Sequence, residues 1–161
     1  RPVILSSKDT EPEKYEKSVI ILYSLMIYMS LAQSVGITLF SRLIINIAYG
    51  KEYLAAITPL RIVVWYTTFS YLGAARNVWI LAENLQKYML LMNICGAAAN
   101  VILNTVLIPI MGASGAALAS LVTQAFTNFI IGYFIKPIVP TNRLMVKAIN
   151  PKYLINLVAG K

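Results

Sequence analysis

The sequence predicts an all-α membrane protein, with about four transmembrane helices paired in antiparallel hairpins. The composition is the first reason: of the 161 residues, 58% are hydrophobic and 12% are charged, about half the charged share of an ordinary soluble domain. The second reason is three long runs without a charged residue, at 18–41, 88–109 and 113–135. Because an α-helix rises about 1.5 Å per residue, each run can cross the roughly 30 Å hydrocarbon core of a bilayer.

The N-terminal part contains a polar segment, a span and an amphipathic segment. Residues 1–17 are polar and of mixed charge, lack the apolar core of a signal peptide, and are expected to form a loop. The first span follows directly. Residues 42–57 are amphipathic, and the run from Arg42 to Lys51 is too short to cross a membrane. We therefore expect this segment to lie in the interface, with a break at Gly50.

The second span, 58–80, carries two arginines. Arg61 and Arg76 lie 15 residues apart in the sequence. On a helix this separation is about 22 Å along the axis and within about 60° of one face. An arginine inside a membrane helix costs a few kcal/mol unless it snorkels, pairs or faces water. Two interpretations therefore remain: both side chains reach for the membrane surfaces, or both line a polar cavity on one helix face.

Asparagines follow one face of the third span, 88–109. Positions i, i+4, i+7 and i+11 of this face are Asn93, Ala97, Asn100 and Asn104. Three amides on one face do not face lipid comfortably, so they either bond a neighbouring helix or line a wet interior. Pro109 and Gly112 are expected to end this helix at a tight turn.

Small residues open the fourth span, 113–135, and polar residues continue the same face. The series is Gly112, Ala116, Ser120, Gln124 and Asn128. Small side chains let membrane helices approach one another closely, so this face is expected to pack against a neighbour. Residues 137–161 are basic and are expected to form a tail, whose short apolar piece at 153–158 would lie on the membrane surface.

The distribution of lysine and arginine predicts the orientation. With four spans, eleven of the fourteen basic residues fall on the side that holds both chain ends, and three fall on the other side. The positive-inside rule places the richer side in the cytoplasm. Residues 1–17 then form a cytoplasmic loop and residues 137–161 a basic cytoplasmic tail, on either side of a transmembrane bundle at 18–136.

The residue types argue against several other classes of protein. A net charge of +8 often indicates nucleic acid, but here the basic residues lie at the ends of apolar runs, where membrane topology places them. The single cysteine, Cys95, excludes an internal disulfide framework. The chain has no histidine, the commonest metal ligand and neutral-pH general base. We therefore expect no nucleic acid, no metal, no cofactor and no enzymatic activity.

Three stretches resemble the bacterial polysaccharide flippases. Residues 48–61 (AYGKEYLAAITPLR) are similar to their LYG-x-x-Y…P-x-L-R run. Residues 82–87 (AENLQK) resemble their A-E-N/G-x-x-K turn. Residues 100–117 (NVILNTVLIPIMGASGAA) resemble the signature N-x-x-L-N-x-x-L-I-P-x-x-G-x-x-G-A-A, which recurs across the multidrug/oligosaccharidyl-lipid/polysaccharide exporter superfamily. The first two stretches favour the O-antigen type.

The resemblance implies a transporter of a dozen or more helices, in two halves around a central cavity. By alternating access it would move a polyprenyl-diphosphate-linked oligosaccharide across the bacterial cytoplasmic membrane, for surface polysaccharide synthesis. The present chain would then be the last four helices of a longer protein. The implied partners are the lipid-linked oligosaccharide, membrane lipid and the remaining helices of the parent protein.

The chemistry of that substrate selects candidate residues on the substrate path. A diphosphate crossing a low-dielectric region would be stabilised by cations, which favours Arg61 and Arg76. Sugar hydroxyls suit amide side chains, which favours Asn100, Asn104 and Gln124 for sugar or helix contacts. The alternatives are an ion-coupled multidrug exporter of the same superfamily, for which the spans lack an embedded carboxylate, and a structural membrane subunit.

Overall fold

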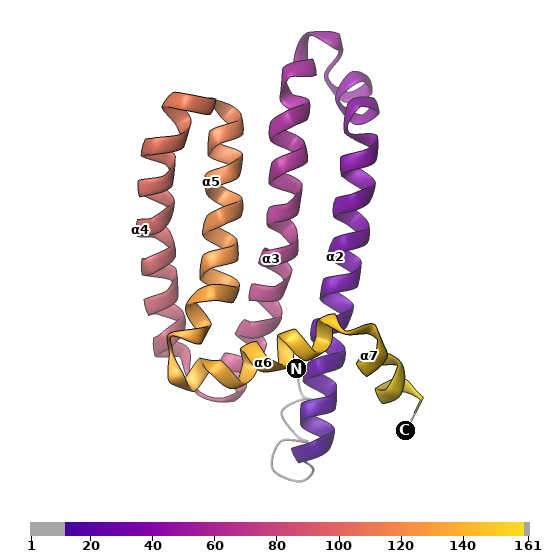
Figure 1. Cartoon of the computed structure of the whole chain (residues 1–161), viewed down its shortest axis with the longest axis vertical. Helices are drawn as coiled ribbons and strands as arrows, with labels where there is room; N and C mark the ends of the chain where they lie inside the picture. Colours follow the sequence, from indigo (N-terminus) through magenta and orange to yellow (C-terminus); the bar gives the residue numbers. More distant parts are fainter. Residues whose placement is uncertain (1–11, 160–161) are drawn as a thin grey trace.

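The computed structural model describes residues 12–159, and this part of the chain consists of helices joined by short turns, with no strand. Four long helices stand side by side as two antiparallel hairpins (Figure 1). They are α2 (Pro12–Ala48), α3 (Ile57–Ala82), α4 (Gln86–Met111) and α5 (Ala113–Ala125). The shorter elements are η1 (Lys51–Ala56), η2 (Phe126–Ile130), η3 (Ile131–Tyr133), η4 (Lys136–Ile138), α6 (Val139–Ile149) and α7 (Pro151–Val158). The all-helical prediction is therefore confirmed.

Three of the helical segments are long and apolar enough to cross a membrane, by their length and composition. They are Pro12–Ala48, Gln86–Met111 and Ala113–Tyr133. These segments indicate a membrane-embedded protein. The helix α3 has the same 26-residue length as α4, but it carries Arg61 and Arg76 and does not belong to this group. That α3 forms a fourth span remains a prediction.

The helix α2 is longer at both ends than the sequence suggests. It begins at Pro12, so the predicted loop at 1–17 is wrong for its last six residues, and residues 1–11 lie outside the described part. Proline suits the first turn of a helix, and Glu13 beside it favours the positive end of the helix dipole. The predicted interfacial segment at 42–57 is also wrong in part, because the helix continues to Ala48 before the backbone turns at Gly50, where φ is +87°.

The ends of α4 and α5 also differ from the predicted bounds. Pro109 does not end α4 but lies inside its last turns, where its missing N–H removes a single helical hydrogen bond. The turn is made by Gly112, whose φ of +56° suits a residue without a Cβ. Past Ala125 the fourth run is no longer α-helical, since it continues as the π-helical turn η2 and the 3-10 turn η3.

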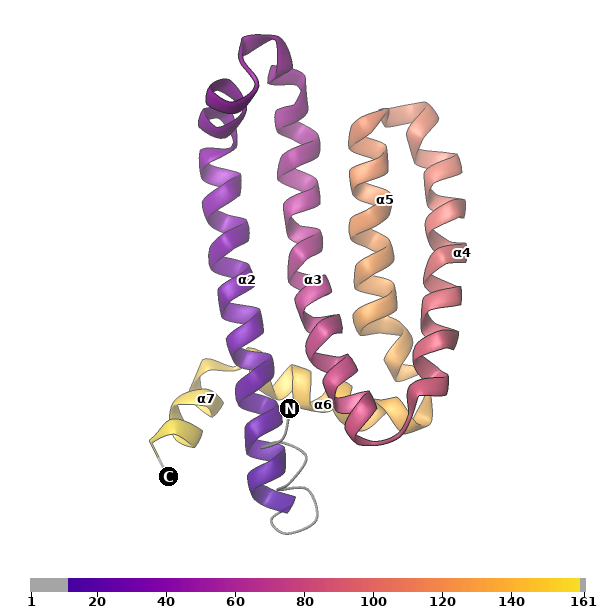
Figure 2. The same cartoon turned by 180° about the vertical axis from the view of Figure 1, so that it is seen from behind.

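The segment predicted as a tail is folded against the bundle. The helix α6 crosses its base, at the end where α2 begins, and α7 extends to one side (Figures 1 and 2). The inner face of α6 is buried, including Met145 and Ala148. Tyr23 of α2 shares a hydrogen bond with Thr141, and Ser24 Oγ donates to the Ala148 carbonyl at 3.1 Å. The description of 137–161 as a tail is therefore wrong for its first half.

The apolar core is concentrated at this base, where α2, α3 and α6 meet the first turns of α4 and the short turns η3 and η4. Its most buried members include Ile20, Tyr23, Ile80, Met92, Ile138 and Met145. Elsewhere the bundle is thin and large apolar side chains face outward, most of all on α4. In a membrane such side chains contact lipid tails and stabilise insertion.

We expect the Tyr23–Thr141 contact to contribute measurably to stability. Tyr23→Phe leaves the fully buried Thr141 hydroxyl without this partner, and such a loss costs about 1–3 kcal/mol. Glu16→Gln is the matched control, because its ion pair with Lys147 is 3.0 Å long but about half exposed. An exposed pair contributes at most about 1 kcal/mol. Denaturant titration of the chain in detergent measures both, and equal effects would show that α6 is not held at Thr141.

Candidate functional site

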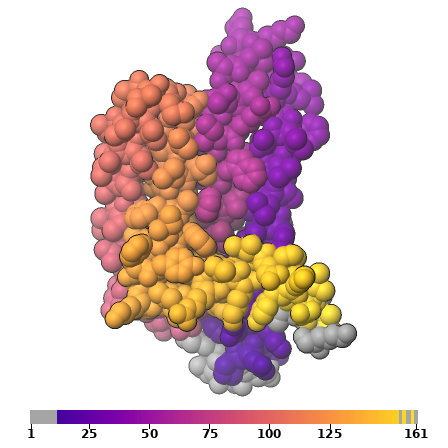
Figure 3. Space-filling view, in the orientation of Figure 1, coloured from indigo at the N-terminus to yellow at the C-terminus, as the bar shows by residue number. Residues whose placement is uncertain are grey.

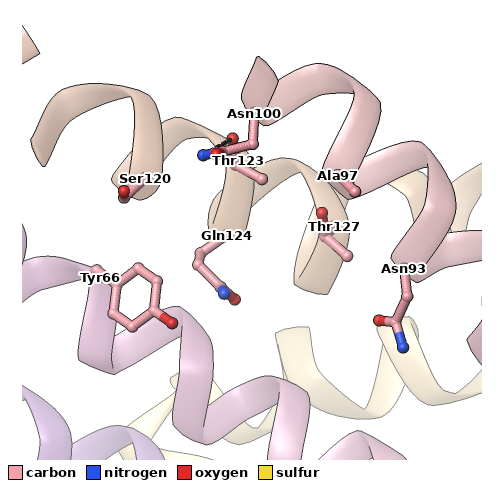
Figure 4. Close-up of a pocket in the computed structure, with 9 residues that line it drawn as sticks. Tyr66, Asn93, Ala97, Asn100, Ser120, Thr123, Gln124 and Thr127 are labelled. Atoms are coloured by element: carbon pink, nitrogen blue, oxygen red, sulfur yellow. Dashed lines mark hydrogen bonds between the residues drawn. The ribbon is translucent and has the colours of Figure 1, made fainter. Parts of the chain in front are cut away.

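A polar cavity of about 360 Å³ lies between α3, α4 and α5 (Figure 4). Its walls carry amides, hydroxyls and one aromatic ring, and no charged side chain lines it among the described residues. The lining residues are Tyr66, Asn93, Gly96, Ala97, Asn100, Ser120, Thr123, Gln124 and Thr127. A cavity with these walls can hold water or an uncharged polar group, because each wall offers donors and acceptors.

Glycines allow η2, the π-helical turn after α5, to approach both α3 and α4 behind the cavity. A Cβ placed on Gly73 of α3 would lie 2.6 Å from Asn128 Cγ, and one on Gly96 of α4 would lie 3.1 Å from Thr127 Cγ2. Real Cβ atoms do not tolerate the first of these distances, so a glycine is needed at Gly73 for this packing. The two contacts place Thr127 and Asn128 between α3 and α4, at one end of the cavity.

Arg76 ties α3 to the π-helical turn of α5. Its side chain is 2% exposed, and its two terminal nitrogens donate to the Thr127 carbonyl at 2.9 Å and to Asn128 Oδ1 at 3.1 Å. In a π-helical turn the i→i+4 hydrogen bonds are interrupted, so backbone carbonyls become available to side-chain donors. Asn142 of α6 uses another of them, since its Nδ2 donates to the Phe129 carbonyl at 2.6 Å. The turn is therefore held from both α3 and α6.

Hydrogen bonds connect this turn to the cavity. Asn128 Nδ2 donates to Gln124 Oε1, and Gln124 lines the cavity. On the α4 side, Asn100 Nδ2 donates to Thr123 Oγ1 at 3.2 Å (Figure 4). Asn104 Nδ2 in turn donates to Asn100 Oδ1 at 2.8 Å. The amides of Asn100 and Gln124 thus have their orientations set by neighbouring side chains.

One hydroxyl of the cavity lining is buried without a partner. Thr127 is 8% exposed, and its Oγ1 makes no hydrogen bond with any described residue. A buried hydroxyl without a partner costs free energy, so rotation of the Thr127 side chain towards a polar group bound in the cavity would be favourable. The chemistry that the cavity offers is therefore binding of neutral polar groups.

The two arginines selected from the sequence do not meet, and neither lines the cavity. Arg61 is exposed near the opposite end of α3, where its Nε donates to Ser41 Oγ at 2.7 Å. Arg76 is buried, and its two terminal nitrogens donate to the backbone and to a side chain of η2, the π-helical turn after α5. The interpretation that both line one polar cavity is therefore wrong for this arrangement. Of the amides, Asn100 and Gln124 line the cavity, and Asn104 lies one hydrogen bond away.

The polar face of α5 was not recognised in full from the sequence. Ser120, Thr123, Gln124 and Thr127 lie at i, i+3, i+4 and i+7, which is one helix face. The spacing was therefore sufficient to predict this polar face, although Gln124 was its only member chosen as a candidate for the substrate path. No sequence pattern marked Tyr66, because its place in the cavity lining depends on how α3 lies against α5.

Comparison of the chain with protein-family models, with curated proteins and with solved structures finds no match. The class of protein therefore rests on the fold and the site themselves. They define an all-helical, membrane-embedded protein with an uncharged polar cavity between its helices.

Proposed function

We propose that this chain is part of a flippase that moves a polyprenyl-diphosphate-linked oligosaccharide across the bacterial cytoplasmic membrane. The observation that carries the proposal is the uncharged polar cavity between helices whose outer faces are apolar. Sugar hydroxyls both donate and accept hydrogen bonds, and amide and hydroxyl side chains match them without the desolvation cost of a buried ion. The resemblance of 48–61, 82–87 and 100–117 to polysaccharide flippases supports the same substrate class.

In this proposal the two arginines have different roles. Arg76 shapes the cavity through Thr127, Asn128 and Gln124, so it acts as a positioning residue. Arg61 is exposed and its guanidinium is free to meet a diphosphate at the other end of α3, apart from the one bond to Ser41. The remaining helices of the parent protein would complete the walls of the cavity.

Filling the cavity tests the proposal in the full-length parent protein, expressed in a bacterium that lacks its own polysaccharide flippase. Ala97 and Ala98 are adjacent, exposed residues of α4, but only Ala97 lines the cavity. We expect Ala97→Leu to lower surface polysaccharide about tenfold or more, which corresponds to about 1.4 kcal/mol of lost substrate binding. Ala98→Leu, which adds the same side chain towards lipid, is the matched control.

Equal export by the two leucine variants at equal membrane levels would contradict the proposal. Loss of drug resistance in Ala97→Leu, without any effect on polysaccharide, would contradict it in favour of a multidrug exporter. Membrane levels measured on the same cells separate both outcomes from a failure to fold.

A further inference from the structure

Positive charge is in excess at the C-terminal end of the chain, although Lys147 forms an ion pair with Glu16 of α2. Residues 84–161 contain six lysines and arginines and no aspartate or glutamate. Arg143, Lys147 and Lys152 lie on α6 and α7, and all three are exposed. Such a group of cations is attracted to an anionic surface. Salt screens this electrostatic attraction, which falls off within about a Debye length of 8–10 Å.

The C-terminal elbow, by which we mean α6 and α7 together, lies across the long helices instead of along them (Figures 1 and 3). The elbow forms because Pro151 cannot continue α6, and the Asn150 side chain accepts from the Lys152 amide at 3.0 Å to start α7. If the apolar helices cross a bilayer, an element that runs across their ends lies in the plane of its surface.

Apolar side chains accompany the cations on the outside of the elbow. Val146, Ile149, Tyr153 and Ile155 are between 37% and 63% exposed. Lys147 Nζ lies 5.9 Å from the centre of the Tyr153 ring and 3.0 Å from Glu16 Oε1, and the Glu16 carboxylate raises the pKa of this lysine. A surface that exposes aliphatic groups, tyrosine and cations together is typical of helices at the lipid headgroup level.

We propose that the C-terminal elbow binds anionic phospholipid at the membrane surface, with Arg143 and Lys152 contacting lipid phosphates and Ile155, on the same side of α7 as Lys152, reaching the acyl boundary. Charge complementarity selects this occupant, since the elbow offers cations and no carboxylate of its own. Each basic residue near an anionic leaflet contributes about 1 kcal/mol, or about fivefold in affinity. The inference concerns a lipid site outside the cavity and stands independently of what the protein transports.

The proposal is tested by measuring which lipid lies next to α7, with the whole 161-residue chain in vesicles of phosphatidylcholine and phosphatidylglycerol. A fluorophore is attached at the exposed position Asn156→Cys, in a Cys95→Ala background, because Cys95 is the only cysteine. Quenching is measured with nitroxide-labelled phosphatidylglycerol, and then with nitroxide-labelled phosphatidylcholine at the same mole fraction. We expect the anionic lipid to quench about fivefold more effectively, and the difference to fall steeply between about 50 and 500 mM salt.

Charge-removing and charge-keeping variants complete the test. Arg143→Gln with Lys152→Gln should abolish the preference, whereas Arg143→Lys with Lys152→Arg should keep it. Lys51→Gln, an exposed lysine at the opposite end of the bundle, is the matched control and should change nothing. Equal quenching by the two lipids would overturn the proposal. Absence of quenching by either lipid would overturn it too, because α7 would then lie in water or against protein.

Discussion

Replacing Arg76 by lysine is expected to destabilise the bundle by about 3 kcal/mol or more, because each hydrogen bond to a charged group contributes about 1.5–3 kcal/mol. The guanidinium reaches two acceptors on η2 at once, the Thr127 carbonyl and Asn128 Oδ1. Lysine keeps the positive charge but has a single ammonium group and cannot reproduce this planar fork. The variant should therefore lose the contact between α3 and the π-helical turn while the net charge stays the same.

The stability of the purified chain in detergent checks this expectation by thermal or denaturant unfolding. Arg61→Lys is the matched control, since Arg61 is exposed and donates a single bond to Ser41. We expect the control to lie within about 1 kcal/mol of the parent chain. An Arg76→Lys chain as stable as the control would show that the charge alone, and not the forked hydrogen bonds, is what the buried site requires.

Replacing Gly115 by alanine is expected to separate the α4–α5 hairpin and to destabilise the bundle by about 3 kcal/mol or more, at the upper end of overpacking effects. A Cβ at Gly115 would lie 2.6 Å from the carbonyl carbon of Leu107, which belongs to the backbone of α4. A side chain could turn away, but a backbone carbonyl inside a helix cannot. The turn leaves a single residue, Gly112, between the two helices, too few to absorb the shift.

Gly36→Ala is the matched control, because a Cβ on Gly36 of α2 meets no atom within 4 Å. There the substitution should be neutral, or stabilising by up to about 1 kcal/mol from helix propensity. Unfolding transitions of the two variants under the same detergent conditions measure the difference. If Gly115→Ala matched Gly36→Ala, the close backbone packing of this hairpin would be wrong.

Local patterns in the sequence were sufficient for the helical class and for the approximate positions of the helices. Segments that cross lipid lack charged residues, so a long uncharged run indicates the position of a helix. The run at 88–109 accordingly lies inside α4, which extends two residues further at each end. The asparagine face of α4 was also predictable from the sequence, because amides at helical spacing identify one side of a helix. Asn100 consequently lies in the cavity lining, and Asn104 directly supports it.

The burial of Arg76 depended on the tertiary structure. The sequence places Arg61 and Arg76 on similar faces of one helix, yet one is exposed and the other is 2% exposed. The difference arises because α5 changes to a π-helical turn beside Arg76 and offers a free carbonyl there. Helix periodicity reports only which face a residue occupies, and it does not report what lies opposite that face.

The sequence by itself determined that this chain is a set of apolar helices with polar stripes, because burial in lipid and helix geometry act on each segment alone. Only the tertiary structure decided that 139–149 closes the base of the bundle, through the Tyr23–Thr141 and Ser24–Ala148 contacts. These contacts join residues more than a hundred positions apart. No local pattern encodes such a pairing, because its free energy exists only once both surfaces are in place.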